Sequence, residues 1–190
     1  MEITESGIKF SFPEGFTAVK FDDTNFYRQR YLNVEGGKGV DVIADSDDAL
    51  YIIEVKNCSD TAENQDAWRR HFSGTRNMDT FATEITQKVA HTLACYTGVS
   101  SFGTLIQQDL EMLKIAKALQ SKRYSSETKK LYVLLYLEGD FSCKTRSNET
   151  ILRDIKLRIQ NKLKWLHCRV LQRRPPAPQY RVCRHPGSYR

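Results

Sequence analysis

Two carboxylates and one ammonium interrupt a strongly apolar stretch of the sequence, KGVDVIADSDDALYIIEVKN, at residues 38–57. They are Asp41, Glu54 and Lys56. An unpaired charge among Val and Ile side chains is costly, so these residues predict a site that supplies its own counter-charge. Paired carboxylates bind hard divalent cations, and a nearby lysine can stabilise negative charge that develops on a phosphate. The set therefore indicates metal-assisted phosphoryl chemistry.

The two apolar halves of this stretch predict strands over 39–45 and 50–56 that pair as an antiparallel hairpin. The expected loop is closed by Ser46 and Ala49 and has two aspartates at its tip. This loop sets the register, in which the numbers of any two paired residues sum to 95. In that register, Val40 shares a face with the other valines of the two strands, away from the charged residues.

The same register sets Asp41 directly opposite Glu54, with their Cβ atoms about 5 Å apart. Lys56 lies two residues beyond Glu54, so it shares that face of the hairpin. Two ionised carboxylates so close repel each other by about 3–4 kcal/mol at an effective dielectric near 20. One lysine offsets only part of this repulsion, whereas a divalent cation offsets all of it.

Hydrophobic periodicity predicts the elements around the hairpin. The segment 8–21 alternates and breaks at Pro-Glu-Gly, which is typical of a hairpin or of two short strands. We expect helices over 24–33 (capped by Asp22 or Asp23), 79–96, 104–122 and 148–166 (capped by Asn148), strands over 131–138 and 167–172, and a turn of helix within 57–79.

This order of elements predicts an α/β fold, more closely an α+β mixed sheet flanked by helices. We expect one domain over residues 1–172, with 131–138 as a central strand buried on both faces. The segment 173–190 is basic and Pro-rich, and we expect it to be a poorly ordered tail.

Asp41, twelve intervening residues and then Glu54-Val55-Lys56 on an apolar strand resemble the PD-(D/E)xK nuclease superfamily, which has the restriction-endonuclease-like fold. The resemblance covers roughly residues 20–172, since the family also follows its motif with a helix, a strand, a helix and a strand. It implies a restriction-endonuclease-like core and a Mg²⁺ or Mn²⁺ ion bound by Asp41, Glu54 and the backbone carbonyl of Val55. It also implies that Lys56 is the catalytic lysine.

The sequence departs from the family pattern in three places. Val40 stands where the family has proline, and Gln87 is followed by His91 where some relatives have tyrosine. Members often add a glutamate from the first helix, and the candidates here are Asp22, Asp23 and Glu35.

Charge is distributed unevenly along the chain. Residues 144–190 contain thirteen Lys or Arg against two acids, a net +11, whereas the rest of the chain carries −5. A basic segment suits a polyanionic partner, nucleic acid ahead of an anionic membrane, although a solvated helix face with a basic tail fits equally. The candidates for nucleic-acid contacts are Arg69, Arg70, Arg76, Gln87 and Lys88.

Other features of the sequence exclude several classes of protein. No apolar stretch is long enough to span a membrane, and the N-terminal MEITES lacks the apolar core of a signal peptide, so we expect a cytoplasmic protein. The five cysteines form no C-x-x-C pair and are expected to be reduced. The GGKG at 36–39 lacks the spacing of a phosphate-binding P-loop.

The leading hypothesis is a metal-dependent nuclease, a hydrolase of phosphodiester bonds with DNA as the expected substrate. One alternative is a catalytically inactive nuclease-fold protein that binds nucleic acid or a protein partner. Another is a structural domain whose basic tail alone contacts nucleic acid. The sequence leaves a homodimer open.

Overall fold

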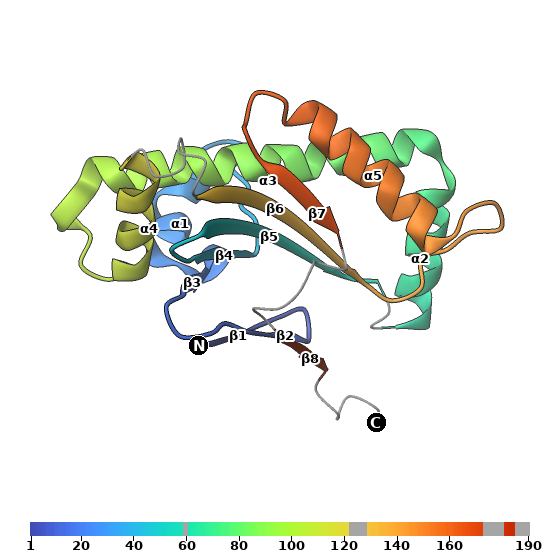
Figure 1. Cartoon of the computed structure of the whole chain (residues 1–190). Helices are drawn as coiled ribbons and strands as arrows, with labels where there is room; N and C mark the ends of the chain where they lie inside the picture. Colours follow the sequence, from blue (N-terminus) through green and yellow to red (C-terminus); the bar gives the residue numbers. More distant parts are fainter. Residues whose placement is uncertain (59–60, 122–128, 173–180, 185–190) are drawn as a thin grey trace.

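The computed structural model describes residues 1–58, 61–121, 129–172 and 181–184, and its fold is mixed α/β (Figure 1). A five-stranded sheet in the order β3-β4-β5-β6-β7 forms its centre, and a smaller sheet has the order β1-β2-β8. The strands are β1 (Glu2–Glu5), β2 (Ile8–Ser11), β3 (Thr17–Lys20), β4 (Val42–Asp45), β5 (Ala49–Asn57), β6 (Lys130–Glu138), β7 (Arg169–Gln172) and β8 (Arg181–Arg184). The helices are α1 (Asn25–Gln29), α2 (Ala62–Ser73), α3 (Thr75–Phe102), α4 (Leu110–Gln120) and α5 (Asn148–Lys162), with 3₁₀ turns η1 (Phe21–Asp23), η2 (Tyr31–Asn33) and η3 (Gly103–Leu105).

The central sheet is mixed, as the sequence predicts. Strands β3, β4 and β5 pair antiparallel, whereas β5, β6 and β7 pair parallel. The predicted central strand is confirmed, because β6 lies between two parallel neighbours and most of its side chains are buried. The restriction-endonuclease-like identity of this core stays a prediction.

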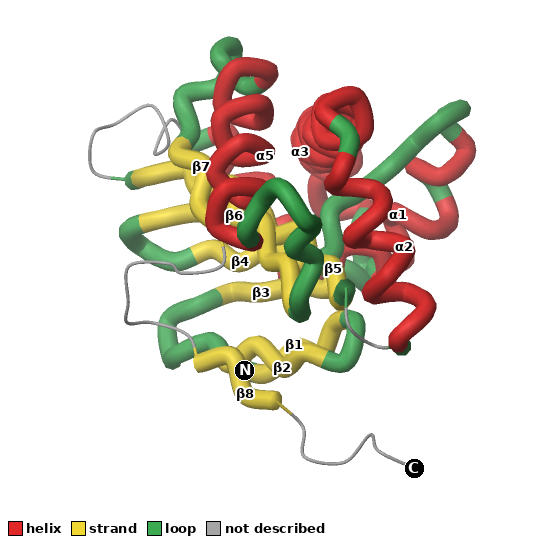
Figure 2. The backbone as a smooth tube through the Cα atoms, turned by 90° about the vertical axis from the view of Figure 1, so that its right-hand side faces the viewer, coloured by secondary structure: helices red, strands yellow, loops and turns green. Residues whose placement is uncertain are grey.

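The central sheet is covered differently on its two faces. Helices α3 and α5 lie on one side of it, and β1 and β2 lie on the other (Figure 2). Ile43 and Ile52 belong to the core on the helix side, whereas Val42 and Ile53 belong to a second core that includes residues of β2. Alternate residues of β5 therefore point toward the helices.

The predicted register of the β4–β5 hairpin is confirmed within the two strands. Ile43 pairs with Ile52, and the Ser46 N–H donates to the Ala49 carbonyl at 2.9 Å. The predicted first strand is too long, however, because the ladder ends where Val42 pairs with Ile53.

The expected pairing of Asp41 with Glu54 is not formed. The Asp41 N–H donates to the Ile53 carbonyl at 3.1 Å, so Asp41 and Val42 both lie against Ile53 in the manner of a β-bulge. The bulge turns Val40 into the helix-side core, whereas a regular strand would have placed it beside Val42. Sequence alternation alone carries no signal for this extra residue.

The expectations for the ends of the chain are confirmed in part. The segment 8–21 forms two short strands, one of the two alternatives expected, and not a hairpin, because β2 pairs with β1 and β8 while β3 pairs with β4. Within the expected tail, residues 181–184 form a strand that adds to the small sheet. The rest of that expectation, 173–180 and 185–190, lies outside the described residues.

The helices differ from their predicted bounds mainly where tertiary contacts define their ends. Helix α3 extends beyond 79–96 at both ends, and α2 is a full helix rather than a single turn. The carboxylate of Asp109, distant in sequence, accepts hydrogen bonds from the first N–H groups of α1, a role that the sequence analysis gave to Asp22 or Asp23. Ser147, not Asn148, caps α5 and accepts from the Thr150 N–H.

None of the helices in the described residues is long and apolar enough to cross a membrane. Cys58 and Cys95 are buried in the core, which fits the expected structural role of the cysteines.

Candidate active site

Glu54 and Lys56 lie in the C-terminal part of β5 and, by strand alternation, face the helix-covered side of the sheet with Ile52. Glu54 is only 1% exposed, although it carries a carboxylate. The Lys56 Nζ lies 2.7 Å from the Glu54 Oε1, and its side chain keeps 26% exposure. The carboxyl ends of parallel strands commonly hold the ligand sites of α/β sheets, and this pair lies near such an end.

Asp41 reaches the same place through the bulge before β4. Its carbonyl accepts from the Phe21 N–H at 2.8 Å, and its Oδ2 accepts from the Val55 N–H at 2.6 Å. Asp41 is thus held through its backbone by η1 and through its carboxylate by β5. Gly39, two residues earlier, has no room for a Cβ because the chain lies against the rings of Phe21 and Tyr27.

Lys88 of α3 joins the two carboxylates. Its Nζ lies 2.6 Å from the Glu54 Oε1 and 3.8 Å from the Asp41 Oδ1. One turn further along α3, the Thr92 Oγ1 accepts from the Val40 N–H, which ties the helix to the segment that carries Asp41. The result is a cluster of four charged side chains, Asp41, Glu54, Lys56 and Lys88, which we call the carboxylate–lysine cluster.

The electrostatics of the cluster reflect burial and crowding of like charges. Burial and the neighbouring Glu54 charge raise the pKa of Asp41 to about 6, although Lys88, the Val55 N–H and Lys56 act in the opposite direction. Burial disfavours the ammonium of Lys56, but Glu54 and Asp41 outweigh it and raise the pKa of Lys56 above its ordinary value. Lys56 is therefore a fixed positive charge at neutral pH and not a proton acceptor.

The two oxygens of the Glu54 carboxylate differ in their hydrogen-bond partners. Glu54 Oε1 contacts both lysines, whereas the buried Oε2 has no hydrogen-bond partner among the described residues. A buried polar atom without a partner costs free energy and is uncommon in folded proteins, so it indicates a missing ligand or water. The Oε2 atom is therefore the position in the cluster at which an additional cation or donor fits.

Asp22, one of the candidates for a further acid, lies close enough for the Asp41 charge to affect it. Burial first and then the Glu5 charge raise the pKa of Asp22, with Asp41 contributing in the same direction. Within the described parts of the chain, however, no three His, Cys, Asp or Glu side chains form a group that could hold a metal ion. A metal here would have two protein carboxylates, which fits Mg²⁺ when substrate phosphate and water complete its coordination.

The other predicted contact residues lie outside the cluster. Arg69 is engaged by Asp140 at 2.5 Å and by Asp66 at 3.4 Å. Arg70, Arg76 and Gln87 are exposed on α2 and α3. The sequence makes Lys88 a candidate in two ways: as a nucleic-acid contact and, with Gln87 and His91 on the polar side of the 79–96 helix, as a residue that points at the metal site. The structure places Lys88 against Glu54, a contact that the sequence does not specify because it does not reveal which turn of α3 lies over β5.

The sequence predicts that the backbone carbonyl of Val55 binds a metal ion, and this role stays a prediction. The structure shows a different contact of Val55: its N–H donates a hydrogen bond to the Asp41 carboxylate.

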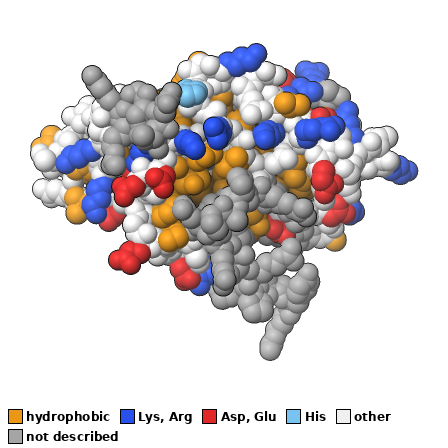
Figure 3. Space-filling model, viewed as in Figure 1, with side chains coloured by type: hydrophobic (Ala, Val, Ile, Leu, Met, Phe, Trp, Pro, Cys, Tyr) orange, Lys and Arg blue, Asp and Glu red, His pale blue; other side chains and the backbone are white. Residues whose placement is uncertain are grey.

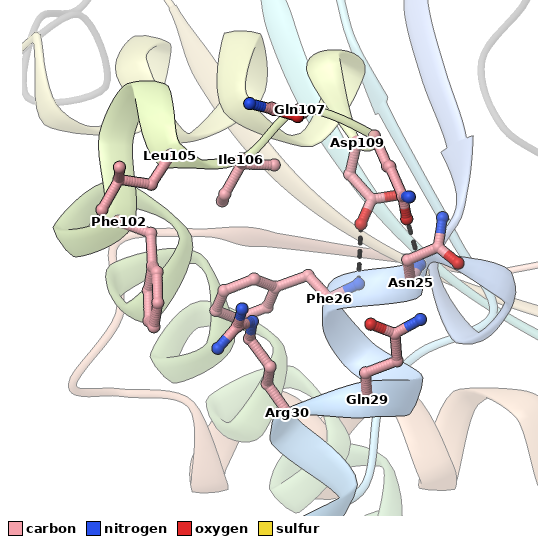
Figure 4. A pocket seen from close by; sticks show the side chains of 10 residues that line it. Asn25, Phe26, Gln29, Arg30, Phe102, Leu105, Ile106, Gln107 and Asp109 are labelled. Carbon is pink, nitrogen blue, oxygen red and sulfur yellow. Dashed lines mark hydrogen bonds between the residues drawn. The ribbon is translucent and has the colours of Figure 1, made fainter.

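A separate cavity of about 230 Å³ lies between α1 and the segment that joins α3 to α4 (Figure 4). Asp109 lines it and caps α1, and the Arg30 guanidinium lies 4.5 Å from the centre of the Phe102 ring. None of the four residues of the carboxylate–lysine cluster lines this cavity.

Fold and site together define a mixed α/β protein with a buried carboxylate–lysine cluster near the carboxyl end of a central strand. A family described as "Family of unknown function (DUF6661)" matches residues 24–175, and the chain belongs to that family. No curated protein matches the chain. Nor does any solved structure match it.

Proposed function

We propose that this chain is a metal-dependent nuclease that hydrolyses phosphodiester bonds in nucleic acid, with DNA as the expected substrate. The observation that carries the proposal is the convergence of Asp41, Glu54 and Lys56, with the buried Glu54 Oε2 left without a partner among the described residues. The resemblance of these three residues to the PD-(D/E)xK motif supports it.

The residues present fit a hard divalent cation. Asp41 and Glu54 would hold Mg²⁺ or Mn²⁺, and carboxylate oxygens are the ligands that such ions prefer. The bound ion would supply Lewis-acid charge to a phosphoryl oxygen and to the attacking water.

Each protein group has a role that its surroundings support. The Val55 N–H fixes the orientation of the Asp41 carboxylate, so that oxygen does not need to reorganise on binding. Lys56 is protonated and partly exposed, and it is suited to stabilise charge that develops on the phosphate.

The surface offers basic groups for the polyanion. Figure 3 shows Lys and Arg side chains along the part of this face that lies over α5 and β7. Arg153, Lys164 and Arg169 are exposed in this region of the sequence. Contacts of this kind attract the phosphate backbone without reading its sequence.

The test is to purify the wild type and Lys56→Ala and to incubate each with DNA and RNA substrates in Mg²⁺ or Mn²⁺. We expect cleavage by the wild type and a loss of about 10²-fold or more in Lys56→Ala. Wild-type cleavage that Lys56→Ala leaves intact would contradict the mechanism.

One observation favours a second candidate, a catalytically inactive protein of the same fold that binds nucleic acid or a protein partner. The Lys88 ammonium already neutralises part of the charge on Asp41 and Glu54 without any metal. Titration with Mn²⁺ separates the two candidates. Binding that Asp41→Asn weakens supports the nuclease, and no binding to the wild type supports the inactive protein.

A further inference from the structure

Lys88 lies at the centre of the carboxylate–lysine cluster, although it belongs to a helix outside the motif. Its Nζ is within 4 Å of both carboxylates, at 2.6 Å from Glu54 and 3.8 Å from Asp41. The helix beneath it is fixed, because Ile85 and Val89 are fully buried on either side of Lys88 in the sequence. The position of the ammonium is therefore set by the packing of α3 on the sheet.

The charges of the cluster balance without a metal. Two carboxylates face two ammonium groups, and both ammonium groups contact the same atom, Glu54 Oε1. A divalent cation added to this arrangement would leave a net charge of about +2 in a mostly buried place, which is unfavourable. If one ammonium leaves when the cation arrives, half of that excess is removed.

Lys88 is the ammonium better placed to compete with a cation. It approaches both carboxylates, whereas among the described residues the ion pair of Lys56 is with Glu54. A lysine side chain is long and flexible, so its ammonium can move while the helix stays in place. The Lys88 side chain retains 14% exposure, which connects it to solvent.

We propose that Lys88 is an internal counterion: it holds Asp41 and Glu54 together in the metal-free protein, and a divalent cation displaces its ammonium from them. The inference rests on the proposed function, because that function supplies the cation. In this inference the Lys88 ammonium and the cation compete for the same two carboxylates, and this competition sets the metal affinity of the site.

The experiment compares Mn²⁺ binding by calorimetry to the full-length wild type, Lys88→Met and Lys114→Met. Methionine keeps the length of the side chain but removes the charge. Lys114 is an exposed lysine on α4 and serves as the matched control. We expect Lys88→Met to bind Mn²⁺ about tenfold more tightly than the wild type, since removing a competitor strengthens binding by its coupling factor. Lys114→Met should bind as the wild type does.

The outcomes separate the inference from the proposed function. Equal affinity in the wild type and Lys88→Met overturns the inference and leaves the metal-dependent function standing. Binding to Lys88→Met alone shows that Lys88 excludes the cation and is not displaced by it, which overturns the inference and contradicts a metal-dependent activity of the wild type. If neither the wild type nor Lys88→Met binds Mn²⁺, the inference and the proposed function are both overturned, because no cation then displaces Lys88.

A second measurement covers the case in which Lys88→Met folds poorly. Lys88→Gln keeps a hydrogen-bond donor for Glu54 without the charge, and its thermal midpoint is measured with and without Mn²⁺. At a fixed concentration, a ligand that binds the folded state stabilises it more when it binds more tightly. We expect a larger Mn²⁺-dependent rise in midpoint than in the wild type. An equal or smaller rise contradicts the inference.

Discussion

The two ends of the β4–β5 hairpin both carry buried charges, but the charges are satisfied differently. At the turn end, the Lys129 Nζ lies 2.8 Å from the Asp45 Oδ1, and the two side chains are only 2% and 15% exposed. At the opposite end, Glu54 is contacted by both Lys56 and Lys88 and still keeps one oxygen without a partner among the described residues. At the turn end one ammonium lies against one carboxylate, whereas at the other end two ammonium groups contact one oxygen of Glu54 and a second carboxylate lies close by.

This difference indicates where the hairpin supports structure and where it supports chemistry. Removing one member of a buried ion pair is costly, so the pair at the turn end stabilises the folded hairpin. In the cluster at the other end, two carboxylates share two ammonium groups, and a cation that displaces one ammonium can take its place. The apolar strand residues between the two ends provide the rigid support that such a site needs.

The largest expected effect comes from Glu54→Gln. This substitution removes a carboxylate that the proposed mechanism needs, so we expect nuclease activity to fall by about 10³–10⁴-fold. The measurement is cleavage of DNA in Mg²⁺ or Mn²⁺, normalised to the folded protein by circular dichroism. Asp45→Asn at the turn end is the matched control, and it should keep the activity of the folded fraction. An equal loss of activity in both variants would show that the two ends do not differ in the proposed way.

The next largest expected effect is a loss of stability caused by a substitution at the turn end. Lys129→Met leaves Asp45 without its 2.8 Å ammonium partner, and removing one member of a buried pair costs about 4 kcal/mol of unfolding free energy. Lys56→Met should cost less, because Lys56 is more exposed and Lys88 still contacts Glu54. Urea unfolding followed by tryptophan fluorescence measures both values. The reverse order of the two losses would contradict the comparison.

The sequence predicts one end of the hairpin better than the other for a physical reason. The register from Ser46 to Ile53 follows from a short turn and alternation, and it is confirmed. The geometry at Asp41 depends on a bulge and on hydrogen bonds with Val55 and Phe21, which are contacts between segments distant in sequence. Side-chain alternation does not encode such contacts.

The same limit applies to the helix that completes the cluster. The apolar stripe of 79–96 predicts that a helix packs on the sheet, and α3 does so. Its placement along the sheet decides that Lys88 meets Glu54, and that placement depends on the whole core. The convergence of the three motif residues with Lys88 therefore required the three-dimensional structure.

A smaller effect is expected from the pH dependence of stability. The pKa of Asp41 is raised from 3.8 to about 6, so the folded protein holds this proton more tightly than the unfolded chain does. Between about pH 4 and pH 6 the unfolding free energy should therefore fall as pH rises, by about 3 kcal/mol from this group.

The measurement is urea unfolding with a chelator at several pH values, and the comparison is wild type against Asp41→Asn. The variant lacks the titrating group, so the difference between the two curves isolates its contribution. We expect Asp41→Asn to gain stability relative to the wild type as pH rises toward 7. A constant difference across this range would show that Asp41 is not destabilised by burial and by Glu54.

The smallest effect extends the contrast between paired and available charges to the arginines of α2 and α3. Arg69 is held by Asp140 and Asp66, whereas Arg70 and Arg76 are exposed. If the exposed pair contacts phosphates, each Arg→Ala substitution should reduce by about 1 the slope of log affinity for DNA against log salt concentration. Arg69→Ala should change the slope less, because its guanidinium is already neutralised by protein carboxylates. Fluorescence anisotropy at several salt concentrations measures these slopes, and equal slopes for all three variants and the wild type would exclude this surface from nucleic-acid binding.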